Sequence, residues 1–309
     1  MKLYIKVNDI HTLKNFDELL QAHASRFEPL ISPAMHPKYK HYYYAIKEIQ
    51  NNQHYFYDER ELKKVIKGVY FGNSYCEHLL PSPLDIAKAY SYFNDTHHNF
   101  VFVFPPIGEH KMEEAKEILE ELKQLDIKEV VVNDFGMLQL AKDEFKVILG
   151  INFTKTIKNA FLDAKESLEV SSKQLVNQKN LTTHLEFEID FVREFYKSMG
   201  ISRVSIENKP YDMSFLEKKP LFYADIYYPN STISYSRACD IAGIYNDKQT
   251  YFPAKSCQKY CAKTSLEFEH SKVLNLYQEY NTIYKPHLRL ELPESVYKNK
   301  RNRLVWEIF

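Results

Sequence analysis

The chain has 309 residues, and its 41 Lys and Arg residues are balanced by 41 Asp and Glu residues, so the formal net charge is zero. This balance excludes a whole-molecule electrostatic attraction for nucleic acid or an acidic membrane surface. Hydrophobic residues make up 44% and aromatic residues 15% of the chain, which argues against disorder, and no run of 18 apolar residues predicts a membrane span.

The N-terminal residues predict a strand followed by a helix. Residues 1–7, MKLYIKV, alternate in polarity and precede Asn-Asp, which is typical of a strand and not of a signal peptide. Thr12 is suited to cap a helix over the residues that follow. Without a secretion signal we expect a cytoplasmic protein, in which thiols stay reduced and can bind metal.

Residues 30–66 interrupt this order and are predicted to form an insertion. The segment 36–50, HPKYKHYYYAIKEIQ, is aromatic and cationic, and residues 58–66 have a short helical pattern. A group of Tyr, His and Lys side chains is able to bind an aromatic or anionic ligand. Packing of such rings against the rest of the fold is the more frequent use of such a segment.

From residue 66 onward, strand and helix patterns alternate. Residues 99–107, NFVFVFPPI, are almost wholly apolar, as expected of a strand with both faces buried in a parallel sheet. Residues 111–125 predict an amphipathic helix. The other strands predicted here are residues 66–72, 128–134 and 145–152, and the other helices are residues 81–93 and 135–142.

The second half of the chain is less regular. No element is predicted for residues 154–184, and residues 186–200 predict a helix that ends at Gly200. The remaining predictions are a strand over 201–208, extended chain over 221–237, a strand and helix over 265–284, a last strand over 287–294 and a solvated basic end over 298–303.

Together these elements predict one α/β fold. About eight strands separated by helices indicate βαβ units, a parallel sheet and a TIM-like (β/α)8 barrel. Residues 30–66 would form an N-terminal excursion, and residues 236–262 would form an irregular, cysteine-bearing loop. Because no linker or internal repeat divides the chain, residues 1–309 are predicted to be a single domain.

The four cysteines raise the question of a shared ligand. Cys76 follows a predicted strand, whereas Cys239, Cys257 and Cys261 are spaced C-x17-C-x3-C far along the chain. Two disulfides would need an oxidising compartment. Four thiolates suit a structural zinc ion or an iron–sulfur cluster, and unconnected buried thiols are the fourth alternative. The spacing leaves these alternatives open.

Polar residues follow several predicted strands, at the end where the active site of a barrel lies. Asp134 is a candidate general acid or base, with a cap for the following helix as the equal alternative. Glu207 is likewise a candidate general acid or base, and a surface carboxylate is the alternative interpretation. Arg237 is suited to neutralise thiolates or to grip a carboxylate ligand, and an ordinary ion pair is the alternative. Other polar residues in equivalent places are Asn73, Asn133 and Asn152.

Several common functional motifs are missing from the sequence. It has no phosphate-binding loop, dinucleotide-binding glycine motif or zinc-protease helix. His97, His98 and His110 lie beside predicted loops, where a histidine is more often solvated than ligating.

Four segments resemble the collagenase-like peptidase U-thirty-two family. VYFGNSYC at 69–76 resembles its strand that ends in Tyr-x-Gly, and EVVVNDFGMLQLA at 129–141 resembles its strand before Asn-Asp-x-Gly. YSRAC at 235–239 and the CxxxC pair at 257–261 resemble its cysteine-bearing insertion. The similarity covers residues 67–295 and is greatest to the ubiquinone-biosynthesis proteins UbiU and UbiV. The long gap between Cys239 and Cys257, and residues 30–66, depart from the family pattern.

This resemblance carries expectations about function. It implies a [4Fe-4S] cluster on Cys76, Cys239, Cys257 and Cys261, with zinc as the alternative metal. It also implies oxygen-independent hydroxylation with a heteromeric partner, prephenate as the hydroxyl donor, and a small aromatic substrate or an RNA base as the acceptor. Asp134, Glu207 and Arg237 are the candidate groups on the substrate side. A metal-stapled scaffold without enzymatic activity and a peptidase are the alternative functions.

Overall fold

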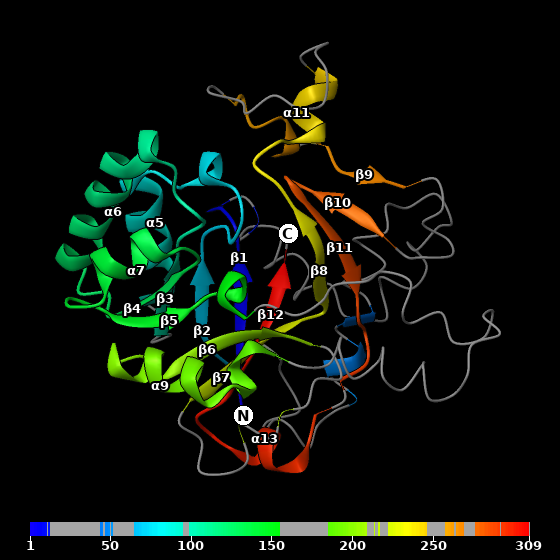
Figure 1. Cartoon of the computed structure of the whole chain (residues 1–309). Coiled ribbons are helices and arrows are strands. Elements are labelled where there is room, and N and C mark those ends of the chain that lie inside the picture. Colours follow the sequence, from blue (N-terminus) through cyan, green and yellow to red (C-terminus); the bar gives the residue numbers. More distant parts are fainter. Residues whose placement is uncertain are drawn as a thin grey trace.

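The chain was analysed as a computed structural model, in which eight parallel strands close into a barrel (Figure 1). The described residues are 1–10, 12, 44–45, 47–49, 51, 65–94, 99–154, 185–208, 213, 216, 222–245, 257–262, 264–268, 276–290 and 292–308.

The barrel strands follow one another around the closed sheet in chain order, and every neighbouring pair is parallel. This confirms the predicted TIM-like α/β barrel. The strands are β1 (Lys2–Val7), β2 (Ile66–Phe71), β3 (Asn99–Val103), β4 (Glu129–Val132), β5 (Lys146–Leu149), β6 (Arg203–Glu207), β7 (Tyr223–Tyr228) and β12 (Arg303–Ile308).

Alternation along each strand separates an inner from an outer core. In β1, Leu3 and Ile5 belong to the large core between sheet and helices, whereas Tyr4 belongs to a second core that fills the barrel. Apart from their first residues the strands are almost entirely buried, which explains their apolar sequences. The members of the inner core are Tyr4, Tyr70, Val101, Val103, Val131, Ile148, Ile151, Tyr227 and Val305.

Helices cover the outside of the first half of the barrel, as the alternation predicted. α6 (Met112–Gln124) is the predicted amphipathic helix, and its residues Ile118, Leu119 and Leu122 are buried. None of the described helices combines the length and apolar character that crossing a membrane requires. The others that follow barrel strands are α5 (Pro83–Asn94), α7 (Phe135–Ala141) and α9 (Asp190–Ser198).

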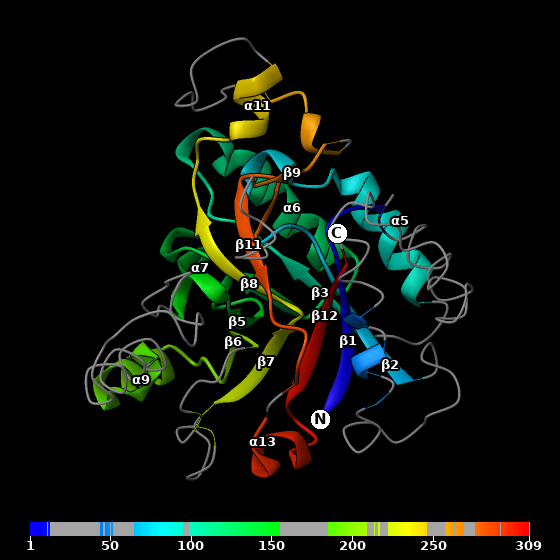
Figure 2. The same ribbon diagram turned by 90° about the vertical axis from the view of Figure 1, so that its right-hand side faces the viewer.

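A small antiparallel sheet is inserted between β7 and β12 (Figures 1 and 2). Its strands are paired in the order β8 (Asn230–Tyr235), β11 (Thr282–Pro286), β10 (Tyr277–Glu279) and β9 (Leu266–Glu267). Both views show β8 leading away from the barrel to α11 (Asp240–Tyr245), at the end opposite the N-terminus and α13 (Glu294–Lys298). This excursion, the cap sheet, carries three of the four cysteines.

Three predictions for the C-terminal part are wrong. Residues 277–286 form the hairpin of β10 and β11 instead of a helix, with Tyr280 in the left-handed region at a φ of 59°. No strand forms over the described part of residues 287–294, because the eighth barrel strand is β12. The basic end is therefore not wholly solvated, since Asn302 and Arg303 are buried at the start of β12.

The predicted loop over residues 236–262 also needs correction, because α11 and a 3-10 turn at Tyr260–Ala262 lie within it. Most of the insertion over residues 30–66, the helix after Thr12, residues 155–184, and His97 and His98 lie outside the described residues.

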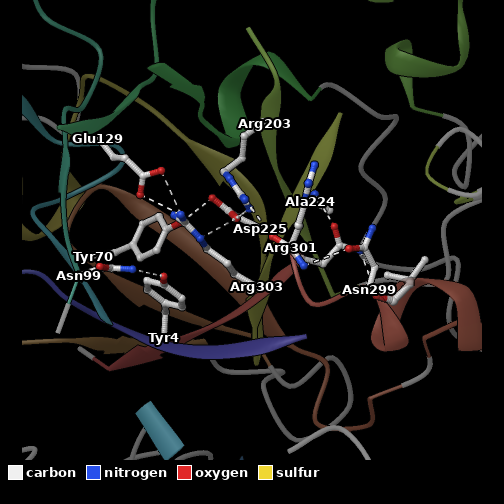
Figure 3. A network of polar contacts seen from close by, with 12 residues as sticks. Tyr4, Tyr70, Asn99, Glu129, Arg203, Ala224, Asp225, Asn299, Arg301 and Arg303 are labelled. Atoms are coloured by element: carbon white, nitrogen blue, oxygen red, sulfur yellow. Dashed lines mark hydrogen bonds and ion pairs between the residues drawn. The ribbon is translucent and has the colours of Figure 1, made fainter. Parts of the chain in front are cut away.

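A network of charges fills the N-terminal end of the barrel interior (Figure 3). Arg303 donates two hydrogen bonds to the carboxylate of Glu129, at 3.0 and 2.8 Å, and a third to the hydroxyl of Tyr70 at 2.8 Å. Asp225 accepts from Tyr70 and, at 2.6 Å, from Arg203. Two cations thus meet two carboxylates, and the network is a structural plug beneath the apolar core.

Candidate metal centre in a thiol-lined pocket

All four cysteines line one cavity, which lies between the end of β2 and the cap sheet. Its volume is about 190 Å³. Cys76 approaches from the barrel, whereas Cys239, Cys257 and Cys261 come from the excursion between β7 and β12. The fold therefore brings Cys76 to the same cavity as three thiols that lie 163 or more residues further along the sequence. The remaining lining residues are Tyr75, Glu77, His78, Leu79, Pro106, Tyr235, Arg237, Tyr280 and Asn281.

The loop after β2 positions Cys76. Gly72 at the strand end has a φ of 120°, which favours glycine, and an added Cβ would lie 2.4 Å from the carbonyl oxygen of Val103. The side-chain oxygen of Asn73 then accepts the backbone N–H groups of Tyr75 and Cys76, both at 2.8 Å. This turn holds the chain so that the Cys76 thiol faces the cavity.

Cys239 lies where the chain leaves the cap sheet and enters α11. Its thiol accepts hydrogen bonds from the backbone N–H groups of Ile241 and Ala242, and it donates to the carbonyl oxygen of Tyr280 at 3.6 Å. The thiol is therefore held between a short helix and the hairpin of β10 and β11.

The CxxxC pair forms a compact turn beside α11. The backbone N–H of Lys259 donates to the sulfur of Cys257 at 3.3 Å, and Lys259 has a φ of 56°, in the left-handed region. Tyr260 stacks on Tyr245 of α11 with ring centroids 4.6 Å apart. This contact joins the pair to the part of the excursion that carries Cys239.

Asn281 connects the two halves of the pocket. Its side-chain amide donates to the carbonyl oxygen of Tyr75 at 3.2 Å and to that of Ser236 at 2.6 Å. The first contact reaches the loop of Cys76, and the second reaches the segment just before Cys239. The rings of Tyr75 and Tyr235, 5.2 Å apart, support the same junction. One side chain thus fixes the barrel thiol relative to the excursion.

Burial raises the pKa values of three of the thiols, those of Cys76, Cys239 and Cys261. Burial raises the pKa of Cys76 to about 12, the N–H groups of His78 and Leu79 oppose this rise, and the neighbouring Cys239 and Cys257 add to it. The pKa of Cys261 is raised by burial and by the other three cysteines. Metal ligation requires thiolates, so metal binding at this pocket would release protons.

Arg237 is the predicted substrate-side residue that the structure places in the pocket. Its side chain is exposed, and the described residues include no ion-pair partner for it. His78 and the rings of Tyr75 and Tyr235 line the same cavity. A cation therefore lies beside aromatic surface and the four thiols.

Asp134 lies outside the lining of this pocket and caps α7, as its alternative interpretation predicted. One carboxylate oxygen accepts the N–H of Met137 and the other accepts the N–H of Ile107, both at 2.8 Å. The neighbouring Asn133 donates to the carbonyl oxygen of Phe104 at 2.8 Å. Together they tie the C-terminal ends of β3 and β4 to one another, and Asn152 donates to Asn133 through its backbone N–H at 3.4 Å.

Glu207 is buried, so its alternative interpretation as a surface carboxylate is wrong. It points into the C-terminal end of the barrel and accepts the N–H of Thr232 in the cap sheet at 2.6 Å. Sequence reasoning missed its neighbours Lys6 and Glu307, an ion pair at 3.4 Å. The available signal was a charged residue, Lys6 or Glu307, next to the last residue of each of these two strands.

The described side chains do not form a site for a single ion as they stand. Among the residues for which the structure gives positions, no three or more His, Cys, Asp or Glu side chains are grouped so that they could hold a metal ion. The fold and pocket define an α/β barrel with four cysteines around one cavity. Comparisons with protein-family models, curated proteins and solved structures found no match to this chain.

Proposed function

We propose that the chain is an iron–sulfur protein that holds a [4Fe-4S] cluster on Cys76, Cys239, Cys257 and Cys261. The observation that carries the proposal is the meeting of all four thiols at one cavity, although Cys76 and the other three come from opposite halves of the sequence. Such clusters are held by four cysteine thiolates. The all-sulfur donor set fits this group.

The backbone around the thiols supports the same proposal. N–H groups two or three residues further along the chain donate to the sulfur atoms of Cys76, Cys239 and Cys257. Hydrogen bonds of this kind stabilise thiolates and tune the reduction potential of iron–sulfur clusters. A buried free cysteine that only packs in a core does not need them.

Zinc is the alternative metal for the four thiols. Four thiolates on one zinc ion, each at about 2.3 Å, lie roughly 3.8 Å from one another. The thiols share the lining of a cavity of about 190 Å³ with nine other residues, and the resemblance to the U-thirty-two family favours a cluster there. A zinc-stapled scaffold remains the alternative that metal analysis distinguishes.

In the proposed reaction the chain takes part in oxygen-independent hydroxylation of an aromatic or nucleobase substrate, together with a partner subunit. This step depends on the resemblance to the U-thirty-two family and to UbiU and UbiV, with prephenate as the hydroxyl donor. With four protein ligands, the cluster supplies one-electron transfer. Arg237 would bind a substrate carboxylate at the pocket, while Tyr75 and Tyr235 provide aromatic surface.

A peptidase has less support from the pocket. No hydrogen bond joins a cysteine thiol to the His78 ring there, whereas a thiol nucleophile is activated by an adjacent base.

Anaerobic metal analysis tests the proposal. The chain is purified without oxygen, iron, sulfide and zinc are measured, and visible and spin-resonance spectra are recorded. We expect a brown protein with about four iron atoms per chain. Each of the changes Cys76→Ala, Cys239→Ala, Cys257→Ala and Cys261→Ala should reduce the iron content severalfold.

Ser74→Ala is the matched control, because it alters the same loop and leaves every sulfur in place. Iron that is unaffected by Cys76→Ala would contradict the ligand set, and one zinc per chain without iron would favour the scaffold. The acceptor is tested in cells that lack the protein and grow without oxygen. Loss of a hydroxylated nucleobase identifies RNA as the acceptor, whereas accumulation of a prenylated aromatic precursor identifies a small molecule.

A further inference from the structure

A carboxylate lies in the wall of the cysteine pocket, directly after Cys76 in the sequence. Glu77 begins the 3-10 turn Glu77–Leu79, and its side chain is only 9% exposed. It lines the same cavity as the four thiols. Because a carboxylate is costly to bury, a charge at this position indicates a role beyond packing.

The partners of Glu77 lie in the loop between β3 and α6. One carboxylate oxygen accepts the backbone N–H of Gly108 at 2.6 Å, and the other lies 3.8 Å from the Nε2 atom of His110. A Cβ atom at residue 108 would lie 2.9 Å from the first oxygen, so the glycine leaves room for this close approach. The hydrogen bond therefore joins the Cys76 turn to a loop 31 residues further along the chain.

This loop forms another part of the pocket wall, because Pro106 also lines the cavity. The N–H of Ile107, next to that of Gly108, donates to Asp134 at 2.8 Å. Two carboxylates thus hold two successive N–H groups of the same loop. Of the two, Glu77 is the one that lines the cavity, so its charge lies beside the thiols.

We propose that Glu77 is a positioning residue of the cysteine pocket, whose carboxylate holds the loop after β3 against the Cys76 turn and whose charge lowers the reduction potential of the cluster. This inference rests on the proposed function. A fixed negative charge disfavours the addition of an electron nearby, and net charge is one of the properties that set the potential of an iron–sulfur cluster. The oxygen of a neutral amide would accept the same hydrogen bond, so the two effects are separable.

Coulomb's law gives the size of the charge effect. Two unit charges roughly 10 Å apart, at an effective dielectric constant of about 20, change an equilibrium by roughly tenfold. A tenfold change corresponds to about 59 mV for a one-electron couple. Removal of the charge should therefore raise the midpoint potential by about this amount.

The charge is tested by the midpoint potential of the cluster-loaded protein, titrated with a one-electron reductant. Glu77→Gln and Glu77→Ala both remove the charge, and each should raise the potential by about 59 mV. His110→Ala is the matched control, because it alters the other partner of the same carboxylate and removes no negative charge. It should not raise the potential. An unchanged potential in Glu77→Gln, or an equal rise in His110→Ala, would overturn the inference while the cluster stands.

The hydrogen bond is tested by hydrogen–deuterium exchange of the protein as purified, followed by mass spectrometry. Pro105 and Pro106 have no N–H group, so the segment 105–110 reports on few amides, among them that of Gly108. Its exchange should be severalfold faster in Glu77→Ala and little changed in Glu77→Gln, whose side-chain oxygen still accepts the N–H.

The two measurements separate failure of this inference from failure of the proposed function. A protein that holds no cluster would overturn the proposed function, and the exchange of the segment 105–110 then decides the positioning role alone. Faster exchange in Glu77→Ala supports that role. Exchange in Glu77→Ala equal to that of the unaltered protein refutes it.

Discussion

The two ends of the barrel interior differ in the charged residues that they bury. At the N-terminal end, Arg203 and Arg303 meet Asp225 and Glu129, so two cations face two carboxylates (Figure 3). At the C-terminal end, Glu307 pairs with Lys6 and lies near a second buried carboxylate, Glu207. Burial raises the pKa of Glu307 to about 7 there.

This difference gives the N-terminal network a structural role and leaves the C-terminal group sensitive to pH. A network of charge-assisted hydrogen bonds between two cations and two carboxylates fixes one arrangement of the strands. A buried carboxyl group whose pKa lies near 7 changes its charge near neutral pH. Substitutions of charged residues at the two ends should therefore have different effects on stability. Four predictions address these ends and the loops beside them.

The largest effect is expected at the N-terminal plug. Arg303→Met leaves the buried Asp225 with one guanidinium partner in place of two and removes the bidentate partner of Glu129. Removing one member of a buried ion pair typically costs about 3–5 kcal/mol, which we expect as the loss in free energy of unfolding in urea. Arg301→Met, at an exposed arginine two residues earlier, is the control. Equal losses in both variants would show that the buried network contributes no more to the free energy of unfolding than an exposed arginine does.

The next effect depends on pH and belongs to the C-terminal end. The folded state binds the proton of Glu307 more tightly than the unfolded state, because the pKa rises from 4.5 to about 7. This stabilisation is fully present below about pH 4.5 and is lost as the pH rises through about 7. It amounts to about 3 kcal/mol.

Urea unfolding of the unaltered protein and of Glu307→Gln at several pH values measures it. The difference between the two free energies should change by about 3 kcal/mol across this range. A constant difference for Glu307→Gln would show that burial does not raise the pKa of Glu307 above its usual range.

A smaller effect is expected where the excursion meets the barrel. Asn281→Ala removes two hydrogen bonds to the carbonyl oxygens of Tyr75 and Ser236 and should lower the free energy of unfolding by about 1–3 kcal/mol. Since this side chain positions Cys76 relative to Cys239, the iron content after anaerobic purification should also fall. Asn73→Ala, which alters the Cys76 loop alone, is the comparison. A loss of stability without any loss of iron would show that Asn281 stabilises the junction but does not position the metal ligands.

The sequence was sufficient for seven of the eight barrel strands. Strands such as β3 and β4 are buried on both faces, and their unbroken apolar sequences make them easy to recognise. The eighth, β12, carries Arg303 and Glu307 at inward positions, so its pattern resembles a solvated end. The same buried charges that hide this strand are those that distinguish the two ends of the barrel.

The candidate site was partly predictable. Cys76 and the C-x17-C-x3-C trio follow from their resemblance to a known pattern, and Arg237 follows from its position two residues before Cys239. Tyr280 and Asn281 were missed, because a hairpin with a tyrosine in the left-handed region is not encoded by a common turn signal. Lys6 and Glu307 are 301 residues apart and become a pair only when the barrel closes.

The smallest expected effect decides between two roles for Asp134. Its two carboxylate oxygens accept backbone N–H groups at the start of α7 and in the loop after β3. Asn keeps one oxygen for the cap of α7 but presents an amide NH₂ group to the N–H of Ile107, so Asp134→Asn should lower the free energy of unfolding by about 1 kcal/mol. Asp134→Ala also loses the cap and should cost about 2 kcal/mol. Urea unfolding measures both. If Asp134 were a general acid or base, Asp134→Asn would in addition lower turnover by about 100-fold or more, far out of proportion to its loss of stability.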